Sequence, residues 1–228
     1  METRDEAVNY FAWQADLFRD IALRGRVIDH GAGTGGLTNA LLEAGARDVV
    51  ALEPDPQLTE VLQRKFDGRD EVQVVCGTLD DYLAQHGPAS VDCIVSSNVI
   101  EHIEDDVACL RAMFDALRPG GSVGLYVPAR QELFGSLDEA VGHYRRYHRG
   151  ELRHKLAAAR FDVRSVRYRN VVGVLPWFIT GRVLRRSKVG AGSIRAFDRV
   201  VFPVFRRIED LFPPLYGLNL VAIGTKPR

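Results

Sequence analysis

Residues 27–35 read Val-Ile-Asp-His-Gly-Ala-Gly-Thr-Gly, and a second apolar run ends eighteen residues later at Glu53. The first run predicts a buried strand that enters a glycine turn and then a helix. The second run predicts a neighbouring strand that brings the Glu53 carboxylate to the same edge of a sheet, where it can accept both hydroxyls of a ribose. This pairing indicates a site for an adenosine-containing ligand.

The acid before the turn narrows the choice of ligand. Gly31, Gly33 and Gly36 also spell the G-x-G-x-x-G of dinucleotide-binding enzymes. Asp29 precedes Gly31 by two residues, where it would repel a pyrophosphate but attract an ammonium group. S-adenosylmethionine has an ammonium, a sulfonium and a ribose but no phosphate, so the pattern favours it. An NAD-dependent dehydrogenase is one alternative, and glycines that serve packing alone are another.

The composition is that of an ordinary globular protein. The chain has 228 residues, of which 46% are hydrophobic and 26% charged, enough to bury one sizeable core. The first ten residues include four charged side chains, and the longest uncharged apolar stretch, 170–181, is too short to span a bilayer. We therefore expect a cytoplasmic protein without a transmembrane segment. The three cysteines lack metal-type spacing and are predicted to be small buried hydrophobes: Cys76, Cys93 and Cys109.

A net charge of zero hides a division along the chain. Residues 1–142 hold 25 acidic and 11 basic side chains, whereas residues 143–228 hold 5 acidic and 19 basic ones. The basic part favours an anionic acceptor, a membrane surface or nucleic acid as its partner. The alternative is that the two parts neutralise each other across the folded surface.

Apolar periodicity predicts alternating strands and helices. The spacing of Val8, Phe11, Ala15 and Phe18 predicts a helix within residues 1–24. Later helices are predicted from about 34, from 56, at 80–85, from 106 to a stop at 119–121, and at 149–159. Strands are predicted at 26–30, 48–53, 71–76, 91–97, 122–127, 161–169 and 218–225. Such alternation predicts an α/β fold, with a doubly wound sheet covered by helices on both faces.

The segment 171–214 between the last two strands is apolar and basic together. Residues 171–183 are apolar on nearly every side, and four basic side chains follow within 182–188. Residues 194–211 form an amphipathic stripe that Pro203 would kink. We predict a helical insertion that acts as a lid over the acceptor pocket, with dimerisation or membrane-surface docking as alternatives.

Several motifs together resemble those of class I S-adenosylmethionine-dependent methyltransferases. The glycine turn and Glu53 resemble the first two motifs of that family, 92–95 with 98–103 resembles the fourth, and 117–121 resembles the turn before the fifth strand. Further motifs are similar to a bacterial branch of small, type 11/12-like enzymes, often fused or adjacent to glycosyltransferases: 135–138, 142–147 and 217–220. The resemblance implies a single domain over 1–228, with a Rossmann-like seven-stranded sheet of order 3-2-1-4-5-7-6 and strand 7 antiparallel.

The resemblance also implies which residues bind the cofactor, S-adenosylmethionine. Asp29 and the glycine turn would line its methionine part, Glu53 its ribose and Asn98 the neighbourhood of the sulfonium. The turn glycines are Gly31, Gly33 and Gly35, and the residues expected to flank the adenine are Thr78 and Leu79. Two positions depart from the family's pattern. Thr78 replaces a common Asp, for which Asp80 is the candidate substitute, and His30 replaces an apolar residue.

Methyl transfer from a sulfonium is an in-line displacement, so the enzyme must mainly orient the acceptor and exclude water. A hydroxyl acceptor also needs a base, and His102 and His143 are the two candidates. The aromatic and basic neighbours of His143 fit a carboxylate or phosphate on the acceptor: Tyr144, Arg146 and Tyr147. Alternatively, His102 caps the following helix and the cluster is a solvated helix entry.

A metal ion is not expected. Some quinone-pathway relatives bind a divalent ion through Glu-x-x-Glu-His, but Asn98 stands here in place of the first glutamate. The predicted function is methyl transfer from S-adenosylmethionine to oxygen, less so nitrogen, of a small anionic or amphipathic metabolite. The expected partner is that small molecule and not nucleic acid, and the expected state is a monomer or homodimer. The alternatives are an RNA methyltransferase and a non-catalytic partner subunit that binds an adenosine ligand.

Overall fold

A computed structural model describes residues 8–186, 207–209, 211, 212 and 214–228. Seven strands form one sheet of order β3-β2-β1-β4-β5-β7-β6, and β7 runs antiparallel to both of its neighbours. The strands are β1 Val27–His30, β2 Val49–Glu53, β3 Val72–Cys76, β4 Val91–Ser97, β5 Leu117–Pro128, β6 Asp162–Arg169 and β7 Asn219–Thr225. The predicted fold class, strand order and direction of β7 are confirmed.

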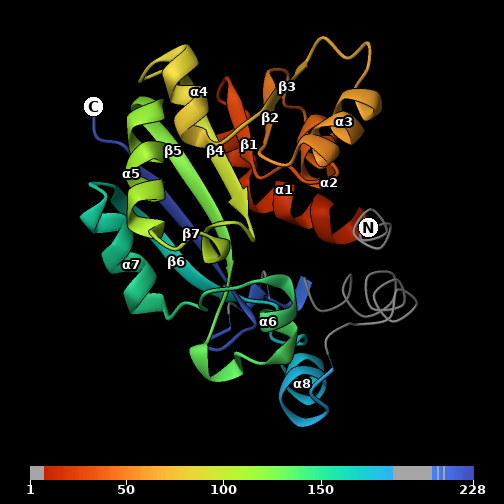
Figure 1. Ribbon diagram of the computed structural model, residues 1–228. Helices are drawn as coiled ribbons and strands as arrows, with labels where there is room; N and C mark the ends of the chain where they lie inside the picture. Colours follow the sequence, from red (N-terminus) through yellow and green to blue (C-terminus); the bar gives the residue numbers. More distant parts are fainter. Residues whose placement is uncertain (1–7, 187–206, 210, 213) are drawn as a thin grey trace.

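Helices cover both faces of the sheet (Figure 1). They are α1 Val8–Ala22, α2 Gly36–Glu43, α3 Pro56–Lys65, α4 Leu79–His86, α5 Asp106–Ala116, α6 Ser136–Val141, α7 Arg149–Ala158 and α8 Val174–Phe178. Shorter turns are η1 Ile100–His102, η2 Gln131–Leu133 and the π-helical η3 Ile179–Val183. The starts of α3 and α5 follow local chemistry, because Asp55 and Asp105 each accept a backbone N–H of the first turn.

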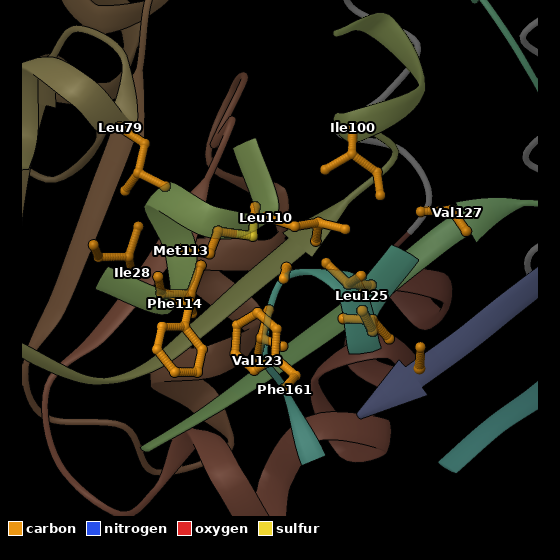
Figure 2. Close-up of a cluster of buried hydrophobic side chains, with 14 of the residues drawn as sticks. Ile28, Leu79, Ile100, Leu110, Met113, Phe114, Val123, Leu125, Val127 and Phe161 are labelled. Atoms are coloured by element: carbon orange, nitrogen blue, oxygen red, sulfur yellow. The ribbon is translucent and has the colours of Figure 1, made fainter. Parts of the chain in front are cut away.

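Alternating strand residues pack into two separate hydrophobic cores, one on each face of the sheet. Val27 packs with α1, α2 and α3 on one face, whereas its neighbour Ile28 packs with α4, α5 and α7 on the other. Figure 2 shows Leu110 and Met113 of α5 in this second core, together with Ile28 and strand residues of β5. Because helices cover both faces of the sheet, ligands can reach it only at the ends of its strands.

Three local predictions need correction. Residues 119–121 were predicted to separate a helix from a strand at 122–127. Instead, β5 already begins at Leu117, which is buried and pairs with Val91. Val8 is exposed at the start of α1, so the buried helix face begins after it. Cys76 is exposed because β3 is an edge strand with one face open to solvent. All three cysteines are free thiols, as expected.

The segment 171–214 is described only in part. It contains α8, η3 and the helical residues 207–209. Most of the predicted amphipathic stripe, including Pro203, lies outside the described residues, so the helical lid stays a prediction. The single domain over 1–228 also stays a prediction. The first seven residues of the N-terminal segment lie outside the described residues. None of the described helices is both long and apolar enough to cross a bilayer.

Candidate active site at the carboxyl edge of the sheet

The glycine turn is fixed by the pairing of β1 with β2. Asp29 and His30 lie opposite Ala51 and Leu52 in parallel register. The turn extends this pairing, since the backbone N–H groups of Gly31 and Ala32 both donate to the Leu52 carbonyl, at 2.9 and 3.0 Å. The end of β1 and the end of β2 are therefore held side by side at the carboxyl edge of the sheet.

The Glu53 carboxylate joins the two predicted cofactor elements directly. Its Oε2 accepts the backbone N–H of Gly33 at 2.8 Å, and its Oε1 accepts that of Asp55 at 3.1 Å. The side chain is buried, and each oxygen keeps a second lone pair that can accept a hydroxyl. The same residue thus anchors the glycine turn and presents a rigid acceptor pair at the sheet edge.

The glycines of the turn have different neighbours. Gly31 has φ +72°, and a Cβ there would lie 2.5 Å from Val99 Cγ2, so packing alone excludes a side chain. Gly33 has φ +58°, but no atom lies within 4 Å of its Cβ position, which faces open space. Gly35 packs against Phe66. Packing therefore explains Gly31 and Gly35, whereas Gly33 borders space that a ligand can use.

Asp29 is a buried acid at the end of β1. Its exposure is 1%, and its Oδ2 accepts a hydrogen bond from Thr38 Oγ1 at 2.6 Å. Burial raises the pKa of Asp29 to about 6, against hydrogen bonds from Thr38 that lower it, and the nearby charge of Glu53 raises it further. A buried carboxylate is suited to receive a positively charged group. Asp29, beside Glu53 and the open space at Gly33, therefore remains the predicted partner of the cofactor amine.

The raised pKa of Asp29 predicts a pH dependence of cofactor binding. Because the pKa is raised to about 6, the carboxyl group is mostly neutral at pH 5 and ionised at pH 7. Only the ionised form attracts the amine, so we expect S-adenosylhomocysteine to bind roughly tenfold more tightly at pH 7 than at pH 5. Calorimetry at the two pH values measures this. Asp29→Asn should bind weakly and equally at both, and an unchanged pH dependence in that variant would contradict the assignment.

His30 faces a neighbouring strand. Its Nδ1 lies 3.0 Å from Ser96 Oγ on β4, and the ring is buried. Burial lowers the pKa of His30 to about 4, so the imidazole is neutral at physiological pH. It therefore adds no positive charge beside Asp29.

The predicted adenine side lies next to Glu53. The Gly77 N–H donates to the Glu53 carbonyl at 3.0 Å, which places the end of β3 beside that of β2. Thr78 begins α4, where its side chain and the Asp81 carboxylate cap each other, with Thr78 Oγ1 2.7 Å from Asp81 Oδ2. Leu79 is buried and Asp80 is exposed. The Thr78 hydroxyl is thus already used as a helix cap.

The end of β4 is closed by the N-terminal helix. Asn98 has φ +53°, a left-handed conformation that asparagine tolerates better than most residues, and its N–H donates to the Tyr126 carbonyl. The neighbouring Ser97 Oγ donates to Gln14 Oε1 on α1 at 2.9 Å. Tyr10 of α1 donates to the Tyr126 hydroxyl at 2.8 Å, and burial raises the pKa of Tyr10 to about 12. Sequence reasoning missed Tyr10 and Gln14, although Gln14 interrupts an apolar helix face.

The two candidate bases are brought together from distant segments. His102 ends η1 after β4, and His143 follows α6 after β5. Their ring centroids lie 4.7 Å apart at an interplanar angle of 75°. His143 Nδ1 lies 2.8 Å from Asp138 Oδ1, and His143 Nε2 lies 3.8 Å from Glu101 Oε1. His102 Nδ1 lies 3.2 Å from the Gly142 carbonyl.

Asp138 holds the tautomer of His143. Its buried carboxylate accepts from His143 Nδ1, from Arg146 Nε at 2.8 Å and from the Gly135 N–H at 3.0 Å. Although burial alone raises the pKa of Asp138, the bonds from His143 and Arg146 lower it below its usual value. An ionised carboxylate only accepts, so Nδ1 of His143 carries a proton toward Asp138, and Nε2 is directed toward Glu101. Asp138 was not among the predicted site residues, because no local pattern links it to His143.

The predicted acceptor-binding residues differ in exposure. Tyr144 is 56% exposed. Arg146 is buried, where it binds Asp138, donates to the Ala129 carbonyl at 3.1 Å and lies 4.8 Å from the Trp177 ring. Tyr147 is buried, and its hydroxyl donates to Asp106 at 2.8 Å. Arg146 and Tyr147 are thus engaged within the protein, and Tyr144 is the one of the three that is open to solvent.

One group of described residues could hold a metal ion. Glu101, His102 and His143 offer ligand atoms that all lie within 4.8 Å of one another. Two imidazoles and one carboxylate suit Zn²⁺ or another transition metal better than Mg²⁺. The absence of a metal requirement stays a prediction.

Comparison with known proteins agrees with this geometry. Residues 28–125 match the family described as Methyltransferase domain. The ubiquinone biosynthesis O-methyltransferase of Xanthomonas campestris is 27% identical over 185 residues, which cover 74% of this chain and 75% of the relative. An uncharacterized methyltransferase of Bacillus cereus is 35% identical over 98 residues, 42% of this chain and 43% of the relative. The fold is shared with the crystal structure of an S-adenosylmethionine-dependent methyltransferase from Archaeoglobus fulgidus, at 15% identity, 96% and 94% coverage and a TM-score of 0.64.

Proposed function

Because the chain is a class I S-adenosylmethionine-dependent methyltransferase, we propose that it methylates an oxygen of a small anionic or amphipathic acceptor. The observation that carries the proposal is the contact of His143 Nδ1 with Asp138, which makes Nε2 the nitrogen that would take a proton from the acceptor. A sulfur or unprotonated amine acceptor needs no such base. The similarity to a ubiquinone biosynthesis O-methyltransferase supports the choice of oxygen.

On the cofactor side, we assign Asp29 to the amine and Glu53 to the ribose hydroxyls of S-adenosylmethionine. Gly33 provides the open space beside them, and Asn98 closes the end of β4. Thr78 and Leu79 border the adenine side. Backbone groups would contact the base there, because the Thr78 hydroxyl is used as a helix cap. When bound, the cofactor supplies a methyl group on a positively charged sulfur. The protein's own task is to orient the acceptor and to exclude water.

On the acceptor side, His143 removes the hydroxyl proton and Asp138 stabilises the imidazolium that forms. A base placed in this way contributes on the order of 10² to 10⁴ in rate. His102 packs edge to face against the His143 ring, so it limits the directions from which a hydroxyl can approach. We assign Tyr144 to contact with the acceptor, whereas Arg146 supports Asp138 and Tyr147 supports the floor of the site through Asp106.

A labelling experiment tests the proposal. The full chain is incubated with S-adenosylmethionine carrying a labelled methyl group and with separate pools of phenols, carboxylic acids, lipid-linked sugars and total RNA. We expect a labelled small molecule whose methyl group is bonded to oxygen. Glu53→Ala should abolish the label, whereas Glu60→Ala, which removes an exposed carboxylate from α3, should leave it unchanged. Label only in the RNA pool, or label on nitrogen, would contradict the proposal.

A further inference from the structure

The helical segment after β6 turns most of its apolar side chains outward. No residue of α8 is buried, and only Gly181 is buried in η3. Leu175 is 65% exposed and Val183 is 60% exposed. The other exposed apolar residues of this α8 surface, as we call it, are Phe178, Ile179 and Leu184. A helix that packs as a lid buries its apolar face, whereas α8 and η3 expose most of theirs.

Polar contacts explain why the apolar side chains face away from the protein. Ser136 Oγ of α6 lies 2.9 Å from the Gly181 carbonyl and 2.7 Å from that of Arg186. Arg182 donates to the Phe134 carbonyl at 3.0 Å. The segment is therefore attached to α6 through backbone and polar groups and to Arg146 through Trp177, whereas Leu175, Phe178 and Val183 remain exposed. Figure 1 shows α8 beside α6, away from the sheet.

The chain returns toward β7 with the same arrangement. Glu209 is buried and its carboxylate accepts the N–H groups of Asn170 and Val171, at 2.9 and 2.7 Å. The apolar residues around it are exposed, among them Leu211, Phe212 and Leu215, of which Leu215 is 86% exposed. Asn170 also donates to Asn219 at the start of β7, at 3.2 Å. At both ends of the segment, next to the carboxyl edge of the sheet, polar groups thus face the protein and most apolar side chains are exposed.

The charge of the segment indicates the kind of partner that it would bind. The sequence from 171 to 197 contains five Arg or Lys residues and no Asp or Glu. Arg185 and Arg186 are exposed next to Leu184. Exposed apolar side chains combined with positive charge are typical of surfaces that bind anionic lipids. A second copy of this chain would bring the same positive charges together, so charge disfavours self-association through this surface.

We propose that the α8 surface docks the protein on an anionic lipid bilayer. Leu175, Phe178 and Val183 enter the headgroup region, while Arg185 and Arg186 contact lipid phosphates. The inference goes beyond methyl transfer and does not depend on it. Docking through this surface turns the carboxyl edge of the sheet toward the bilayer, which gives a lipid-borne acceptor a short route to the site.

Vesicle co-sedimentation tests the docking directly. We expect the full chain to pellet with mixed phosphatidylglycerol and phosphatidylcholine vesicles, to stay in solution with phosphatidylcholine alone, and to be released by high salt. The double variant Leu175→Glu with Phe178→Glu should lower the partition coefficient at least about tenfold. Arg185→Gln with Arg186→Gln should lower it about tenfold as well. Leu23→Glu, at an exposed apolar residue after α1, is the matched control and should change nothing.

Other outcomes would overturn the proposal. They are absence of binding to anionic vesicles, equal binding to both kinds of vesicle, or an equal loss in Leu23→Glu. Light scattering tests the remaining candidate for binding to this surface, a second copy of this chain. If the wild type is a dimer that ignores vesicles and the α8 variants are monomers, the surface is a contact between copies. Circular dichroism melts verify that the variants are folded, which is expected because the substituted side chains are exposed. Methyl transfer to a water-soluble acceptor gives an independent readout of the site.

Discussion

Replacing Glu53 with alanine is expected to weaken S-adenosylhomocysteine binding by about a hundredfold or more. The carboxylate is assigned to the ribose hydroxyls and also accepts the N–H groups of Gly33 and Asp55. Hydrogen bonds to charged groups contribute about 1.5–3 kcal/mol each, so the loss of two ribose contacts accounts for the effect. Calorimetric titration of each variant measures the dissociation constant.

Two controls separate ligand contact from support of the turn. Glu53→Gln keeps one carbonyl oxygen as an acceptor, so it should hold the glycine turn better than alanine and lose less affinity. Glu60→Ala changes an exposed side chain of α3 and should bind like the wild type. Wild-type affinity in Glu53→Ala, with unchanged melting, would exclude Glu53 from the cofactor site.

His143→Gln is expected to lower kcat by about 10²–10³ while the affinity for S-adenosylhomocysteine stays within about twofold, because the base acts on the acceptor and not on the cofactor. Asp138→Asn should also lower kcat, because the amide can donate to Nδ1 and so hold the proton on Nε2, the wrong tautomer for a base. His154→Gln alters an exposed histidine on α7 and serves as the matched control. Steady-state kinetics with a hydroxyl acceptor, once labelling has identified one, measures these effects.

A chelator separates a base from a metal ligand at the same residue. Since Glu101, His102 and His143 lie close enough to share an ion, loss of His143 alone does not distinguish the two roles. We expect wild-type kcat to be unchanged after chelation and dialysis. Loss of activity that returns with added Zn²⁺ or Mg²⁺ would contradict the base assignment, as would wild-type kcat in His143→Gln.

The sequence allowed the first two strand ends to be predicted because their signals are local. The run into Gly31 and the acid at Glu53 each lie within one strand and one turn, and the structure joins them through Gly33. Most strand limits agree to within one residue for the same reason. The antiparallel β7 came from family resemblance, since period-2 or buried apolar runs carry no information on strand direction.

The residues proposed for the acceptor side were named from the sequence, but the contacts among them could not be predicted because they are long-range. Asp138 and His143 belong to a segment with no strong periodicity, and the contacts of His143 with Glu101 and His102 depend on how β4 and β5 end. Arg146 belongs to a charged, aromatic stretch that looks exposed in sequence, yet Asp138 and Trp177 surround it. Thr38 likewise reveals its role only once α2 is seen beside Asp29.

The central claim is that the ends of β1 and β2 form a pocket whose negative charge receives the amine of a sulfonium amino acid. Isothermal titration of the wild-type chain with S-adenosylmethionine, S-adenosylhomocysteine and NAD tests this claim most directly. The account predicts saturable heat with the first two ligands and none with NAD. Saturable heat with NAD, and none with the sulfonium compound or its demethylated product, would contradict it.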